Sequence, residues 1–190
     1  MVSNKQIIYE PSDDSYLLQE TLEKFLEKKD KNIKILDVGS GSGIQILVCK
    51  ELGFSNLLVS DINQEAITYL KSLSLKTRKS NLFSKIKEKF DLIIFNPPYL
   101  PEDNREPGDS KINTTAGKNG YEIIIKFLKQ SKSHLNKNAS ILLVFSSLSK
   151  PEIILKNAGH LGYNYNLLNS KKLFFEELYV YEFQLKNGKV

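Results

Sequence analysis

Apolar residues along this chain fall into two alternating patterns. Short, mostly apolar runs, typical of buried strands, occur at residues 33–38, 56–60, 90–95 and 141–145. Between them, apolar residues recur at the spacing of a helix face. The predicted helices carry Leu17, Leu18, Leu22, Phe25 and Leu26; Ile46, Leu47, Cys49 and Leu52; Ala66, Ile67, Leu70 and Leu73; and Ile123, Ile124, Phe127, Leu128 and Leu135. Strands that alternate with helices predict an α/β fold whose early strands are parallel.

The last part of the chain has a different pattern. Residues 163–170 and 179–185 are predicted as strands, and no helical segment separates them. Two strands joined directly are expected to pair antiparallel. Counting a short strand before Ser80, the pattern predicts a doubly wound, seven-stranded and mostly parallel sheet, with the last strand antiparallel and helices on both faces.

Polar residues mark where three of these helices begin. Ser12 is a predicted N-cap with acids in the following turn, and Asn63 is another. Residues 149–152 read Ser-Lys-Pro-Glu, a capping-box pattern that predicts the start of the next helix. The longest stretch without a predicted element is 100–120, and a loop of that length in a compact domain is usually functional.

Composition narrows the class of protein. The chain has 190 residues, 41% of them hydrophobic and 26% charged, which suits one domain over residues 1–190. No apolar stretch approaches the roughly 18 to 20 residues that span a membrane, and no signal peptide is recognisable, so we expect a cytoplasmic protein. The single cysteine, Cys49, excludes an internal disulfide, and His134 and His160 lie far apart, so no metal site is predicted.

A stiff turn follows the apolar run 90–95. It consists of Asn96, Pro97, Pro98 and Tyr99. Each proline fixes φ at about −65° and lacks an N–H, so the turn is rigid and its carbonyls can accept hydrogen bonds from a ligand. The Asn96 side chain and the Pro97 carbonyl together could hold both hydrogens of one NH2 group, with Tyr99 beside a flat substrate. We interpret the turn as a site for a planar amide or amine, against the alternative of a turn without a ligand.

A glycine-rich loop follows the first predicted strand. Residues 37–43 read Asp-Val-Gly-Ser-Gly-Ser-Gly and lead into a predicted helix, whose N-terminus favours a negatively charged group. The dinucleotide pattern fails because the sixth position from Gly39 is Ile44. The loop instead resembles the cofactor loop of class I methyltransferases that use S-adenosylmethionine. That resemblance implies that Asp37 lies near the methionine ammonium and that Gly39, Gly41 and Gly43 lie along the cofactor.

Two further segments are candidates for the cofactor site. Asp61 ends the second predicted strand, about twenty residues beyond the first glycines, where an acid can accept hydrogen bonds from ribose hydroxyls. We place Ile62 beside it. Residues 80–83 resemble the methyltransferase segment that carries an acid against the adenine amine. Here Asn81 takes that position, followed by Leu82, and the Asn81 carbonyl can accept the same hydrogen bond.

The charged residues of the chain argue against a nucleic-acid substrate without excluding one. The net charge is +5, but only Arg78 and Arg105 among the 27 basic residues are arginine, the residue that base and phosphate recognition favours. Lysine clusters leave an attraction to RNA or the ribosome open, although a solvated surface explains them as well. The segment after the stiff turn contains Glu102, Asp103, Arg105, Glu106, Asp109 and Lys111. This acidic loop would repel a nucleic-acid backbone and favour a basic peptide.

The whole chain resembles the HemK/PrmC-type methyltransferases, which modify a glutamine side-chain amide in class I release factors. Residues 96–99 match their Asn-Pro-Pro-Tyr motif. Residues 9–18, Tyr-Glu-Pro-Ser-Asp-Asp-Ser-Tyr-Leu-Leu, resemble the opening of the archaeal and eukaryotic branch, in which Ser15 stands where a hydroxyl lies near the cofactor. The resemblance implies a Rossmann-like class I methyltransferase fold, with residues 1–30 as a helical segment on the cofactor side. It also implies a small zinc-binding activator protein on an edge of the sheet, which we expect near Leu73, Leu75 and the third strand.

These observations predict a protein-glutamine methyltransferase that acts on a release factor. Asn96, Pro97 and Tyr99 are the expected catalytic residues, Pro98 adds to the substrate site, and Asn96 also borders the cofactor. One alternative is methylation of the exocyclic amine of adenine or guanine in RNA or DNA, which would require the base to leave its stack. A second is a cofactor-binding subunit or sensor without catalysis, which the intact motif opposes.

Overall fold

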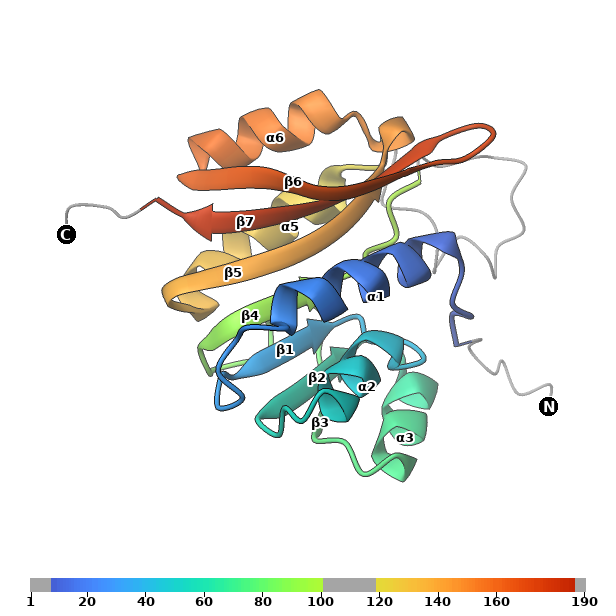
Figure 1. Cartoon of the computed structure of the whole chain (residues 1–190), viewed down its shortest axis with the longest axis vertical. Coiled ribbons are helices and arrows are strands. Elements are labelled where there is room, and N and C mark those ends of the chain that lie inside the picture. The colour runs from blue at the N-terminus through green and yellow to red at the C-terminus, as the bar shows by residue number, and fades with distance from the viewer. Residues whose placement is uncertain (1–7, 101–118, 187–190) are drawn as a thin grey trace.

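A computed structural model of the chain describes residues 8–100 and 119–186. They form one seven-stranded sheet in the order β3-β2-β1-β4-β5-β7-β6 (Figure 1). The strands are β1 (Ile35–Val38), β2 (Leu57–Asp61), β3 (Thr77–Lys79), β4 (Phe90–Phe95), β5 (Leu135–Ser146), β6 (Tyr163–Lys172) and β7 (Glu177–Leu185). The helices are α1 (Asp13–Leu26), α2 (Ile44–Glu51), α3 (Gln64–Ser72), α5 (Glu122–Ser131) and α6 (Pro151–His160), with short 3-10 turns η1 (Lys132–His134) and η2 (Ser147–Ser149).

Strand direction follows the connections that the sequence predicts. β1 pairs in parallel with β2 and β4, β2 with β3, and β4 with β5. The last strand, β7, lies antiparallel to both β5 and β6, because β6 and β7 are joined by a hairpin. The predicted fold class, including the antiparallel last strand, is therefore confirmed.

Two hydrophobic cores cover the two faces of the sheet. Alternate residues of each strand point to opposite faces, so Ile93 of β4 lies in one core and Leu92 in the other. The first core contains the apolar sides of α5 and α6, and the second contains those of α1, α2 and α3. Figure 1 shows the same layering, with α1 and α2 on the viewer's side of the sheet and α5 behind it. Helices on both faces explain why the central strands are almost continuously apolar.

Two of the three predicted helix starts lie where the sequence places them, and the third differs. Asn63 caps α3 as predicted, because its side chain accepts from the Glu65 backbone N–H at 2.9 Å. Ser12 occupies the N-cap position of α1 but makes no cap bond, since its hydroxyl donates to Asp14 at 2.9 Å. The capping box predicted for Ser149 is wrong: its hydroxyl donates to the Tyr99 carbonyl at 2.7 Å, and α6 starts one residue later.

The remaining differences lie at element ends. Ser146 and Ser149 form a capping box around η2 instead, and Lys150, with φ of 54°, precedes Pro151 at the start of α6. Leu135, predicted as the last inward residue of a helix, begins β5, because α5 stops at Ser131 and η1 follows. The acidic loop predicted from Glu102 to Lys111 lies outside the described residues.

The order of the strands creates a crevice beside β1. The helix that follows β1 packs on one face, whereas the helix that follows β4 packs on the other. In open α/β sheets, ligands bind where neighbouring connections leave in opposite directions, outside the carboxyl ends of the strands. Both the glycine loop after β1 and the stiff turn after β4 start at this point. Within residues 8–100 and 119–186, no helix is both long and apolar enough to cross a bilayer.

Candidate active site

A cavity of about 620 Å³ lies at the carboxyl ends of β1, β2 and β4, and its size is typical of small-molecule sites. We call it the carboxyl-end cavity. Strand ends supply Val38, Asp61 and Phe95, and the rest of its lining is Ile8, Tyr9, Ser12, Asp14, Gly39, Gly41, Ile62, Asn63, Ala66, Ser80, Asn81, Leu82, Asn96, Pro97, Pro98, Tyr99, Leu100, Ile123 and Glu176. The stiff turn and the glycine loop, which the sequence predicted separately, therefore share one cavity.

Asn96 lines this cavity and has a buried hydrogen-bond acceptor. Its Nδ2 donates to Asp14 Oδ2 at 3.1 Å and to Ser15 Oγ at 3.2 Å. Because an ionised carboxylate can only accept, the bond to Asp14 fixes which end of the amide is the NH2 group. The other end, Oδ1, is buried and has no hydrogen-bond partner among the described residues. An unpaired buried acceptor is costly, so a ligand N–H that paired with it would be strongly favoured.

Asp14 is the residue that organises this part of the site, and the sequence analysis did not assign it. Its Oδ1 accepts from Tyr9 at 2.8 Å, from the Ser12 hydroxyl and from the Ser15 backbone N–H at 2.6 Å. Its Oδ2 accepts from Asn96 and, at 3.2 Å, from the Tyr99 hydroxyl. The side chain is only 3% exposed. The sequence did contain a signal for this role. Asp14 is the second of two adjacent acids in the first turn of α1, and it lies on the buried side of that helix.

Tyr99 and the prolines form the wall next to Asn96. The Tyr99 hydroxyl points at Asp14, and burial together with the nearby Asp14 and Glu176 charges raises its pKa far above the usual range. The phenol is therefore neutral and donates at physiological pH. The Tyr99 carbonyl accepts from Ser149, which ties the turn to η2. Pro97 and Pro98 both line the cavity, Pro97 as a buried residue.

The three predicted glycines differ in their positions. Gly39 and Gly41 line the cavity with φ of 63° and 52°, a conformation that other residues rarely adopt. Gly43 lies behind them at the start of α2, where an added Cβ would be 2.6 Å from Leu70 Cδ2. Ser15 likewise lies outside the lining, buried beneath the cavity, and reaches it through Asn96. Two glycines thus expose backbone to a ligand, and the third permits close packing of helices.

Asp37 lies under the glycine loop rather than on the cavity wall. It is 2% exposed and accepts a hydrogen bond from the Ser40 hydroxyl. Burial raises its pKa to about 7, the Ser40 hydrogen bond opposes that rise, and the nearby Asp61 charge adds to it. A positively charged ligand group above the loop would favour the ionised form.

Asp61 lines the cavity, and so do Asn81 and Leu82, the residues predicted to lie beside the adenine. The Asp61 carboxylate accepts from the Gly41 backbone N–H at 2.9 Å and from that of Asn63 at 2.8 Å, while burial raises its pKa. Each carboxylate oxygen retains further acceptor capacity for a ligand hydroxyl. Ile62 is 58% exposed at the rim, and Asn81 and Leu82 follow Ser80, whose hydroxyl fixes their turn by donating to the Leu82 carbonyl at 2.8 Å.

This arrangement fits S-adenosylmethionine. The Gly39 and Gly41 backbone forms a cradle that side chains would fill, and Asp61 offers an acceptor for ribose hydroxyls. Ile62 and Leu82 offer apolar surface for a flat base, with the Asn81 amide beside them. Across the described ranges, no cluster of three or more metal-ligating side chains is found.

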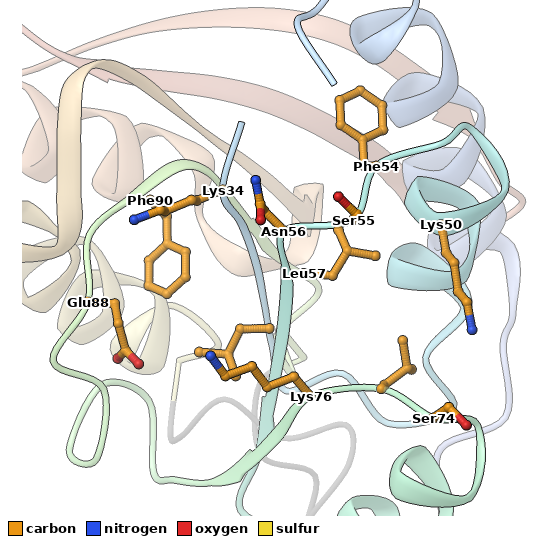
Figure 2. Close-up of a pocket in the computed structure, with 12 residues that line it drawn as sticks. Lys34, Lys50, Phe54, Ser55, Asn56, Leu57, Ser74, Lys76, Glu88 and Phe90 are labelled. Atoms are coloured by element: carbon orange, nitrogen blue, oxygen red, sulfur yellow. The ribbon is translucent and has the colours of Figure 1, made fainter. Parts of the chain in front are cut away.

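A second cavity, of about 500 Å³, lies at the opposite end of the sheet. We call it the amino-end cavity, because it is lined by the starts of β2 and β4, at Leu57 and Phe90, and by Lys34 just before β1. Figure 2 shows its side chains, which include Lys50, Lys76 and Glu88. It contains neither the stiff turn nor the glycine loop, so it is separate from the candidate active site.

The chain is similar to known methyltransferases. The family model of the methyltransferase small domain matches residues 13–172. The MJ0928 protein of Methanocaldococcus jannaschii, named as a protein N5-glutamine methyltransferase, is 32% identical over 91% of this chain and 89% of its own length. Methyltransferase HEMK2 of Homo sapiens is 30% identical over 78% of this chain and 76% of its own. The E. cuniculi Mtq2–Trm112 complex contains a chain of the same fold, with a TM-score of 0.74 and 22% identity over 94% of this chain and 98% of that one.

Proposed function

Since the chain belongs to the methyltransferase small domain family and resembles its HemK-type glutamine methyltransferases over nearly its whole length, we propose that it methylates a glutamine side-chain amide in a class I release factor. S-adenosylmethionine is the methyl donor. The M. jannaschii relative is a protein N5-glutamine methyltransferase by name, and the E. cuniculi complex is responsible for methylation of the eRF1 translation termination factor.

The observation that carries this proposal is the unpaired Asn96 Oδ1. A glutamine amide has two N–H donors, and Asn96, which lines the cavity, has a buried acceptor, Oδ1, without a hydrogen-bond partner among the described residues. Asp14 and Ser15 hold the other end of the Asn96 amide, so the acceptor keeps its orientation when a substrate leaves. We assign the second acceptor to the Pro97 carbonyl, within the same rigid turn.

The chemistry of an amide explains why positioning matters. An amide nitrogen is a weak nucleophile because its lone pair is delocalised into the carbonyl. S-adenosylmethionine, when bound, supplies an electrophilic methyl group on a positively charged sulfur. Asn96 and the Pro97 carbonyl hold and polarise the amide nitrogen, and such positioning contributes on the order of 7 to 11 kcal/mol in favourable cases. The nitrogen becomes acidic once methylated and loses its proton late, so a general base is not required.

Methyl transfer to purified proteins tests the proposal. We expect labelled methyl from S-adenosylmethionine on a class I release factor and none when its Gly-Gly-Gln glutamine is changed. Asn96→Ala should lower kcat/KM by about 100- to 1,000-fold, the usual effect of removing one preorganised polar contact. Asn164→Ala, on exposed β6, is the matched control and should keep full activity.

The same assay also tests the alternative function, methylation of a base in RNA or DNA. Structured RNA and duplex DNA are offered in parallel reactions, because an exocyclic base amine is also a planar NH2 group. Label on nucleic acid with none on the release factor would overturn the glutamine proposal and make the chain a base methyltransferase. Cofactor binding by wild type without transfer to any of these substrates would also count against it.

We further propose a partner subunit, the small zinc-binding activator, on the open edge of the sheet. Lys76 O and Ser80 N bond to β2, so the backbone of the alternate residues Thr77 and Lys79 faces outward from β3. An open edge of this kind can accept a strand from another protein. Of the two leucines expected near this contact, Leu73 is half-buried, whereas Leu75 is 8% exposed within the chain's own core and lines the amino-end cavity.

Lys79→Pro tests this partner. Proline removes an outward N–H without disturbing the bonds to β2, so co-purification of the activator should fall at least tenfold while cofactor affinity is kept. Lys79→Ala changes the side chain alone and should retain the partner. Equal recovery of the activator with both variants would argue against pairing at β3.

A further inference from the structure

The tip of the β6–β7 hairpin exposes two aromatic side chains. Phe174 is 92% exposed and Phe175 is 85% exposed, well above the next large apolar residue, Ile62, at 58%. Their ring centroids lie 4.6 Å apart with an interplanar angle of 81°, so the rings pack edge to face on each other and otherwise face solvent. An exposed apolar pair of this kind marks an interaction site. We refer to Phe174 and Phe175 as the aromatic tip.

The aromatic tip stands on a fixed base. Leu173 N donates to Glu176 O at 2.8 Å and closes the turn, and Glu177 N donates to Ser147 Oγ at 3.0 Å. Leu173 packs against the core beneath the hairpin. Lys171 Nζ pairs with Asp13 Oδ1 at 2.8 Å, which joins the hairpin to the first turn of α1. The rings are thus presented at a defined place, which lowers the entropy lost when a partner binds.

The aromatic tip continues directly into the candidate active site. Glu176, the next residue, lines the carboxyl-end cavity, and its Oε2 is buried without a hydrogen-bond partner in the described part of the chain. Figure 1 shows the hairpin extending beyond β4 and β5 on the side where α1 begins, which is the side of the carboxyl ends. The tip therefore lies beside the cavity in which the target side chain would be held.

We propose that the aromatic tip is a docking site for the folded domain that carries the target glutamine. This rests on the proposed function. The partner chemistry is an apolar depression on a protein surface, with a main-chain N–H of the inserted segment donating to Glu176 Oε2. Lys171 and Lys172 precede the tip and Glu176 and Glu177 follow it, so the hairpin has no net positive charge that would attract a phosphate backbone. The edge-to-face rings also differ from the exposed faces on which successive bases stack.

The test compares a folded substrate with a short one. The double variant Phe174→Ala, Phe175→Ala should raise KM for the intact release factor about tenfold, within the range of aromatic interface anchors. Its kcat should stay within about twofold, since the variant does not touch the cavity. With enzyme loaded with S-adenosylhomocysteine, the Kd for the release factor, measured by calorimetry, should rise by the same factor.

Controls separate docking from folding and from the proposed function. Leu167→Ala removes an apolar side chain that is 45% exposed on the same hairpin, and it should leave KM unchanged. Phe174→Leu, Phe175→Leu keeps the apolar surface and should restore most of the affinity. If wild type methylates the release factor and the alanine variant does so with equal KM and Kd, the docking proposal fails while the proposed function stands. If wild type methylates no release factor, the proposed function fails first.

The alanine variant would also reveal two other possible partners of the aromatic tip. A shift from dimer to monomer in light scattering, with unchanged release-factor affinity, would make the aromatic tip a contact between copies of this chain and overturn the proposal. Loss of RNA binding in the alanine variant, again with unchanged release-factor affinity, would overturn it in favour of base stacking.

Discussion

The two ends of the sheet carry cavities of similar size with different chemistry. The carboxyl-end cavity holds about 620 Å³ and the amino-end cavity about 500 Å³. The first is lined by Asp14, Asp61 and Asn96. These residues come from three separate segments of the chain, and hydrogen bonds hold their side chains in place. The second has an apolar floor of Phe54, Leu58 and Phe90 with exposed lysines around it.

The difference follows from strand direction. At the carboxyl end, each strand runs into a loop that precedes a helix, so backbone N–H groups and capping side chains converge on one crevice. At the amino end, each strand follows a helix or loop whose polar groups face solvent. Volume alone therefore does not identify a site; the buried, unpaired Asn96 Oδ1 does.

After Asn96→Ala, Asp14→Asn should give the next largest effect. The substitution keeps the shape but loses a charged acceptor for Tyr9, Ser15 and Asn96, so the Asn96 amide loses its fixed orientation. Hydrogen bonds to charged groups are worth about 1.5 to 3 kcal/mol, which predicts a fall in kcat/KM of about 10- to 100-fold. Asp13→Asn, at the exposed neighbouring position, should change kcat/KM less than about twofold. Equal effects of the two variants would mean that the Asp14 network does not position Asn96.

Gly43→Ala should lower the free energy of unfolding more than Gly53→Ala does. Both glycines have positive φ, 80° and 88°, but only at Gly43 would the new Cβ meet a side chain, Leu70 Cδ2 at 2.6 Å. Left-handed backbone costs a non-glycine residue about 1 to 2 kcal/mol, and overpacking adds about 1 to 3 kcal/mol at Gly43. Urea denaturation of both variants measures the difference, and similar midpoints would show that Leu70 moves aside freely.

Asp37 should make stability depend on pH. Its pKa rises from 3.8 in the unfolded chain to about 7 in the folded one, so the folded state binds the extra proton between these values. The free energy of unfolding should therefore fall as pH rises from about 4 to about 7 and then level off. Asp37→Asn should remove most of this slope and should be more stable than wild type at pH 8, as measured by urea denaturation without cofactor. An unchanged slope in the variant would assign the pH dependence to other groups.

Lys50→Ala, at the rim of the amino-end cavity, should give the smallest effect. Lys50 is exposed and makes one long contact, from Nζ to the Leu73 carbonyl at 3.4 Å. Exposed substitutions of this kind change stability by about 0.5 kcal/mol or less. Methyl transfer by the variant should equal that of wild type in the same assay. A large loss of activity would show that the amino-end cavity takes part in the reaction, and the contrast between the two ends would collapse.

Most of the fold was predictable because its signals are local. The run 90–95 matches β4, Asn63 caps α3, and the direct connection from β6 to β7 gives their antiparallel pairing. Each depends on neighbouring residues, whose spacing and backbone preferences the sequence displays. Ser149 was assigned wrongly for the same reason: its pattern favours a cap, but a carbonyl 50 residues away competes for its hydroxyl.

The sequence by itself determined where the site would be, and the tertiary structure decided how it is built. The stiff turn and the glycine loop follow from prolines and glycines that restrict or free the backbone locally, so Asn96, Gly39 and Gly41 could be placed in advance. Asp14 and Asn96 are 82 positions apart and meet only because α1 packs beside α2 and over β5 and β7. Glu176 reaches the cavity from the last hairpin in the same way. Contacts between distant segments depend on the strand order and on the packing of helices against the sheet, which no local pattern records.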